Sequence, residues 1–206
     1  MKFKLKLFKI ILKKRSDIMF FVNTLHLSVS KLKKKTFKLN EQQMSFFNDC
    51  LKNICEETDF LKLDSFIQHG DTTCLWHSIA VAYYAYCFAK FFNIKCDEKS
   101  LIYGALLHDY FLYDWHIHDK SHRLHGFKHP KTALNNALKH YDLNKKEIDI
   151  IKNHMFPLTL VPPTHRESIM VCLSDKICSS FETFIGDMYK NLKQNSSLYT
   201  NKSTEN

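Results

Sequence analysis

Beyond residue 40, apolar positions recur every three to four residues, the spacing that places them on one side of an α-helix. Several of these runs begin at a residue type that caps helices, such as Asn40, Thr72 or Thr73, Asp97 and Asn144. The pattern predicts helices over residues 72–93, 97–108, 130–141 and 144–155, with others beginning at 41 and 164. No alternating run flanked by turn residues predicts a β-hairpin.

The scarcity of turn residues favours the same fold class. The chain has 206 residues but only 4 Gly and 4 Pro, so few tight turns can be built and long helices are favoured. A hydrophobic content of 45% is sufficient for a core. We therefore predict an all-α fold: a single compact helical bundle over residues 41–192, with a basic N-terminal arm (1–40) and a polar tail (193–206).

The net charge of +9 belongs to the arm. Residues 1–40 hold twelve Lys and Arg against one carboxylate, Asp17. A poorly ordered or peripheral extension is the favoured interpretation of this arm, and an amphipathic segment that contacts an anionic membrane or nucleic acid is the alternative. No base-reading module accompanies it, so a nucleic-acid partner is not expected.

The cysteines and the apolar runs indicate the cellular compartment of the protein. Seven cysteines with no CxxC pair favour reduced thiols in a cytoplasmic protein. No apolar run approaches the roughly 20 residues of a membrane span. The start, MKFKLKLFKIILKK, is interrupted by lysine too often for a signal peptide.

Histidine and aspartate occur inside otherwise apolar runs at three places. His77 follows Leu75 and Trp76, the pair His108 and Asp109 follows YGALL, and Asp175 lies in VCLSDKIC. Burying such groups costs free energy unless they are paired or coordinated. Adjacent His and Asp diverge by about 100° on a helix, so both can face one metal only near a helix end.

The donor types indicate which metals suit the site. Imidazole and carboxylate ligands fit Mn²⁺, Fe²⁺, Co²⁺, Ni²⁺ or Zn²⁺. The absence of paired cysteine ligands argues against a structural zinc.

The order H…HD…D, in HSIAVA, LLHDY and SDKIC, resembles the HD superfamily of metal-dependent phosphohydrolases over residues 70–185. The resemblance implies an enzyme that hydrolyses a phosphate ester or anhydride of a nucleotide or other small phosphorylated substrate. It also implies metal ligands at His77, His108, Asp109 and Asp175.

Relatives with two metals add histidines between HD and the last Asp. By resemblance, His129 in HGFKHP and His154 in IIKNHMFPL hold a second ion, and Asp109 bridges both ions. The alternative is a one-metal site in which these two histidines only stabilise loops. Two ions are favoured over one.

One departure concerns the Gly-Lys pair that follows HD in many relatives, which here is replaced by Tyr110, Phe111 and Leu112. Candidates to bind phosphate in place of the missing lysine are Arg123, Lys128, Arg166 and Lys176. Of these, Arg123 and Lys176 are predicted, with Asp109, to be the catalytic residues. His116, His118 and His122 are candidates for the general acid. The missing lysine supports an alternative function, a metal-retaining regulatory or ligand-binding domain with little turnover, and a di-iron oxygenase also stays open.

Overall fold

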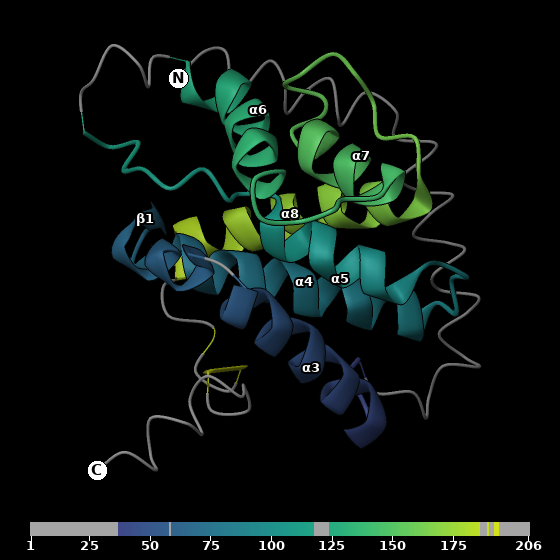
Figure 1. Ribbon diagram of the computed structural model, residues 1–206. Coiled ribbons are helices and arrows are strands. Elements are labelled where there is room, and N and C mark those ends of the chain that lie inside the picture. The colour runs from purple at the N-terminus through teal and green to yellow at the C-terminus, as the bar shows by residue number, and fades with distance from the viewer. Residues whose placement is uncertain (1–36, 58, 118–123, 186–188, 190–191, 194–206) are drawn as a thin grey trace. The chain divides into compact units, whose positions relative to one another are not determined.

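The computed structural model describes residues 37–57, 59–117, 124–185, 189 and 192–193 (Figure 1). Six α-helices, one 3₁₀ helix and two short strands lie within these residues: α3 (Glu41–Glu57), η1 (Asp59–Ser65), β1 (Ile67–His69), β2 (Thr72–Thr73), α4 (Cys74–Phe91), α5 (Glu98–Leu107), α6 (His125–Ala137), α7 (Lys145–Asn153) and α8 (Arg166–Ile185). The prediction of a mostly helical fold is confirmed. The predicted arm and tail lie almost wholly outside the described residues, so their boundaries stay predictions.

The helices begin where the sequence offers caps. Asn40 and Gln43 exchange side-chain to backbone bonds at the start of α3, and the Thr73 hydroxyl accepts the backbone N–H of Trp76 in α4. Asp97 caps α5, and Asn144 forms a capping box with Glu147 at the start of α7. These bonds satisfy backbone donors that have no partner within the helix.

Two local predictions were wrong. Strands β1 and β2 form an antiparallel pair, which the sequence did not predict; the turn between them depends on Gly70, whose φ of 54° favours glycine. Helix α6 begins at His125 rather than at Pro130, which lies inside the helix. The turn preceding α6 is made by Leu124 in the left-handed region, with φ 62°, and the Leu124 carbonyl accepts the first backbone bonds of the helix.

Helix α4 lies at the centre of the bundle, where it packs on α5 and α8 (Figure 1). Helix α5 also contacts α3 and α7, and α7 contacts α6 and α8. Helices α5 and α7 can approach closely at Gly104 because glycine has no Cβ. A Cβ at this position would lie 2.5 Å from Cδ1 of Ile150. None of the helices that the structure describes has the length and apolar character needed to cross a membrane.

Candidate metal centre

Five helices bring the six predicted ligands together in the core. His77 lies in the first turn of α4, His108 caps the end of α5 and Asp109 follows it. His129 belongs to α6, His154 caps α7 and Asp175 lies in α8. Each of the six residues is at most 7% exposed: His77, His108, Asp109, His129, His154 and Asp175. The predicted helix end at the His108–Asp109 pair is confirmed, since α5 stops at Leu107.

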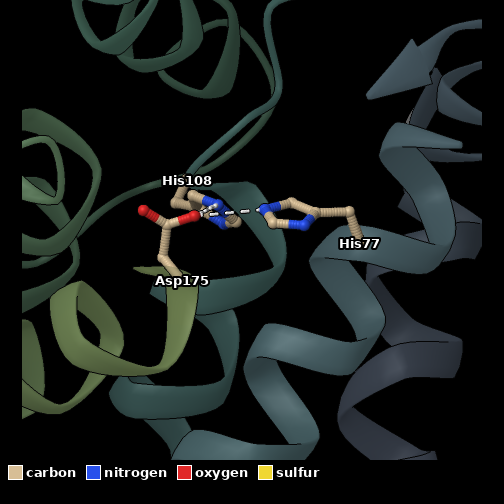
Figure 2. Close-up of side chains that lie close together, drawn as sticks. All are labelled: His77, His108 and Asp175. Atoms are coloured by element: carbon tan, nitrogen blue, oxygen red, sulfur yellow. Dashed lines mark hydrogen bonds and ion pairs between the residues drawn. The ribbon is translucent and has the colours of Figure 1, made fainter. Parts of the chain in front are cut away.

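A first group of ligand atoms meets around one oxygen of Asp175. Its Oδ1 lies 3.2 Å from Nε2 of His77 and 3.8 Å from Nε2 of His108, and Figure 2 shows both rings turned toward it. Oδ2 of Asp109 completes the group, 3.7 Å from Nε2 of His77 and 3.4 Å from Nε2 of His108. Two ligands about 2.1 Å from one ion stand roughly 3.0 Å apart at right angles and at most about 4.2 Å apart when opposite, so these four spacings are compatible with one cation.

A second group of ligand atoms meets around the other oxygen of Asp109. Oδ1 of Asp109 lies 3.2 Å from Nε2 of His129 and 3.5 Å from Nε2 of His154. The two imidazole nitrogens are 2.8 Å apart. Asp109 therefore presents one oxygen to each of two histidine groups, as a carboxylate that bridges two cations does.

In each of the four histidines, a contact made by Nδ1 on the far side of the ring fixes the direction in which Nε2 faces the site. Nδ1 of His108, His129 and His154 donates to the backbone carbonyls of Ala105, His125 and Ile151 at 2.6, 3.0 and 2.9 Å. Nδ1 of His77 instead lies 2.9 Å from the carboxylate of Glu182. Because a carbonyl only accepts, Nδ1 of His108, His129 and His154 must carry a proton. Each of these rings, when neutral, therefore presents the lone pair of Nε2 to the site.

Two of the atoms that face the site are buried without a hydrogen-bond partner, Nε2 of His108 and Oδ1 of Asp109. Buried polar atoms are nearly always satisfied, because an unpaired one keeps its full desolvation cost. Two overlapping groups of buried side chains lie close enough to hold a metal ion: His77, His108 and Asp175 form one, and His108, Asp109 and His154 form the other. A bound cation would satisfy both atoms.

The surroundings of the cluster keep its two carboxylates ionised and His154 neutral, the states in which these groups bind metals. Burial opposes ionisation of Asp109, but the neighbouring His108 and His129 outweigh it and hold the pKa of Asp109 well below its usual value. Burial likewise opposes ionisation of Asp175, and the neighbouring His108 and His77 lower its pKa well below the usual value. Burial lowers the pKa of His154 to about 4, so this ring is neutral at pH 7 and its Nε2 can bind a metal.

Sequence reasoning missed three residues that hold the ligands in place. Nε2 of Gln68 donates to Oδ2 of Asp109 at 2.6 Å, and the Tyr189 hydroxyl donates to Oε1 of Glu182 at 2.5 Å. Glu182 follows Asp175 by seven residues, two helical turns along the same face of α8, a signal that could have found it. Gln68 carried no such signal, because its position depends on the unpredicted strand pairing.

The predicted phosphate-binding residues lie outside this cluster of ligands or outside the described residues. Nζ of Lys176 donates to the carbonyls of His154 and Cys172 at 2.8 and 3.2 Å, and Arg166 donates to the Lys95 carbonyl at 3.4 Å. Lys128 is exposed, and so is His116, which bonds Asp114. Residues Arg123, His118 and His122 fall outside the described part of the chain, so their roles stay predictions.

Comparisons of the chain with family models, curated proteins and solved structures find no match. The buried residues offer two adjacent sets of histidines, and Asp109 presents one carboxylate oxygen to each set.

Proposed function

We propose that the protein is an HD-type, metal-dependent phosphohydrolase that binds two divalent cations and hydrolyses a phosphate ester or anhydride. The observation that carries the proposal is the placement of Asp109, whose Oδ2 faces His77 and His108 while its Oδ1 faces His129 and His154. A structural metal site needs only one closed set of ligands, whereas shared carboxylates are typical of two-metal hydrolytic centres.

The ligands divide into two sets around this carboxylate. His77, His108 and Asp175 would hold one ion together with Asp109, and His129 and His154 would hold the other. Bound divalent cations lower the pKa of coordinated water and neutralise phosphoryl oxygens. The donor set suits Mn²⁺, Fe²⁺, Co²⁺, Ni²⁺ or Zn²⁺.

The other residues of the chain hold the ligands in position. Glu182 orients His77 through Nδ1, and Gln68 fixes the carboxylate plane of Asp109. In the proposed reaction, water adds to phosphorus, the bond to the leaving oxygen breaks, and a proton passes to that oxygen. Arg123 and Lys176 remain the proposed cationic contacts to the phosphate, with Lys176 already anchored beside His154.

The test uses the full chain, stripped with a chelator and then supplied with each candidate metal. p-Nitrophenyl phosphate, its bis ester and a panel of nucleotides are the substrates. We expect metal-dependent hydrolysis that falls by orders of magnitude in Asp109→Asn, because the variant loses the charge that both cations need. Asp142→Asn, which changes an exposed carboxylate, is the matched control and should keep the rate.

A different outcome would favour the regulatory alternative. The observation behind it is that Tyr110 and Phe111, in the place of the usual Gly-Lys, are buried in the core and offer no cation. A protein that binds metal stoichiometrically but hydrolyses no substrate in the panel with any of the five metals would be a metal-retaining binding domain. Hydrolysis that is unaffected by Asp109→Asn would contradict the proposed site.

A further inference from the structure

Helix α8 buries Met170, Val171 and Cys178 in the core, but it also buries its acidic side chains and leaves four large apolar ones exposed. Glu167, Asp175 and Glu182 are buried, at 5%, 7% and 1% exposure. The outward positions recur every four residues, and each is nearly half exposed: Ile169 at 45%, Leu173 at 48%, Ile177 at 47% and Phe181 at 44%. The exposed face of a helix on the surface of a monomer is normally polar, so four exposed apolar side chains in register are unusual. We call these four residues the α8 stripe.

The inward carboxylates are explained by their partners. Asp175 and Glu182 belong to the metal centre, and Glu167 accepts the backbone N–H of Asp97 and pairs with Lys146. The stripe has no such explanation, since its side chains are not part of the buried core. Contiguous exposed apolar surface marks an interaction site more often than isolated apolar residues do.

We propose that the α8 stripe is a homodimer interface, in which α8 of one protomer packs antiparallel against α8 of its partner. The even spacing makes the stripe self-complementary about a two-fold axis between Leu173 and Ile177. Leu173 then faces Ile177 of the partner subunit, and Ile169 faces Phe181 of the partner subunit. This inference concerns assembly and does not depend on the proposed hydrolase activity.

The area and charge of the stripe suit a second copy of the chain. Side chains of this size at half exposure each offer on the order of 100 Å², or about 400 Å² per protomer. A specific interface buries about 800 Å² per partner, so the stripe provides an apolar centre, and the flanks of a 20-residue helix provide the polar rim. The result is a reversible dimer at the small end of specific interfaces.

The occupant is inferred from the lack of charge on this face. Between Ile169 and Phe181 the only cation is Lys176, and its ammonium donates to two backbone carbonyls. A membrane surface or an acidic partner would be matched by exposed basic residues along the stripe. An uncharged stripe brings no like charges together when two copies meet, which favours self-association.

The first experiment is sedimentation equilibrium of the full chain from micromolar to near-millimolar concentration. We expect a monomer–dimer equilibrium that Leu173→Lys weakens by at least about tenfold, because it buries an unpaired charge at the centre of the interface. Leu61→Lys is the matched control, since Leu61 is 49% exposed on η1 and should leave the equilibrium unchanged. Circular dichroism and metal content confirm that each variant keeps its fold.

The second experiment tests the antiparallel register. Leu173→Lys mixed with Ile177→Glu should form a heterodimer, because position 173 of one protomer faces position 177 of the other. Leu173→Lys mixed with Leu173→Glu should not, because these positions do not meet. A wild-type chain that stays monomeric over the whole range, or a Leu173→Lys variant that dimerises as tightly as the control, would overturn the proposal and assign the stripe to another partner.

Discussion

Replacing Asp149 with asparagine tests how α7 is held against the start of α8. Asp149 lies in α7 and is 8% exposed. Its Oδ2 accepts the Ser168 hydroxyl at 2.6 Å and the backbone N–H groups of Thr164 and His165 at 2.9 and 3.0 Å, and it also lies 3.0 Å from Nδ1 of the His165 ring. Its Oδ1 accepts Nδ2 of Asn153 at 2.7 Å. The carboxylate thus caps α8 from a neighbouring helix, since α8 begins at Arg166.

The expected cost follows from the charge on these bonds. Asparagine has the same shape, and the Asn153 amide can turn to bond its new NH₂ group, so the bonds survive but lose their charge assistance. A hydrogen bond to a charged group contributes about 1.5–3 kcal/mol, against about 1 kcal/mol for a neutral one. At the lower end of this difference, about 0.5–1 kcal/mol per bond, the bonds from Ser168, Thr164, His165 and Asn153 together predict that Asp149→Asn lowers the free energy of unfolding by about 2–4 kcal/mol.

The effect should depend on pH. Burial alone would raise the pKa of Asp149, but the bonds from Ser168, His165 and Thr164 outweigh it and hold this pKa well below its usual value. A carboxylate of lowered pKa stabilises the folded state above the pKa of the unfolded chain, about 3.9, and loses that effect as the pH falls toward the folded value. The difference between wild type and Asp149→Asn should therefore shrink below pH 4.

The assay is urea unfolding followed by circular dichroism, on metal-free protein at pH 7 and at pH 3. Asp142→Asn, at an exposed position, should change stability by no more than about 0.5 kcal/mol. A cost below about 1 kcal/mol for Asp149→Asn at pH 7 would refute the capping role, given the bond strengths above. A difference that is the same at both pH values would refute the electrostatic explanation.

Three further changes have definite expected outcomes. Glu182→Gln should lower affinity for the first ion by about 10–100-fold in competition with a chelator, because Glu182 orients His77; unchanged affinity would make Glu182 a bystander. Gly104→Ala should cost about 1–3 kcal/mol in urea unfolding, because its Cβ would lie 2.5 Å from Cδ1 of Ile150, and a neutral effect would mean that α5 and α7 can separate freely. A shortened chain that begins at Lys38 should keep its metal content and turnover, and a fall in either would show that the basic arm supports the domain.

The sequence allowed the helices to be predicted where local signals are strong. Asn40, Thr73, Asp97 and Asn144 cap the helices that their spacing indicated, because capping depends on residues three or four apart. The β1–β2 pair could not be predicted, since two- and three-residue strands carry too little alternation to be seen. The start of α6 was missed because Leu124 adopts a left-handed conformation that its residue type disfavours.

The site residues could be predicted where a buried polar side chain interrupts an apolar run in the sequence. His77, His108, Asp109 and Asp175 stand out because each interrupts an apolar run. Residues that reach the site through contacts between distant parts of the chain do not interrupt an apolar run. Gln68 is one of them: it lies in β1 and bonds Asp109, 41 residues further along the chain. Long-range contacts of this kind follow from the whole fold and not from local spacing.

Metal content tests the central claim most directly. The full chain is loaded with Mn²⁺ or Fe²⁺, desalted and measured by inductively coupled plasma mass spectrometry, beside His129→Ala, His154→Ala and the exposed control His140→Ala. We predict about two ions per wild-type and control chain, and about one in His129→Ala and in His154→Ala with the fold intact, because each change removes a ligand of the second ion only. Full metal content in both His129→Ala and His154→Ala, or a wild-type chain that binds a single ion, would contradict a centre bridged by Asp109.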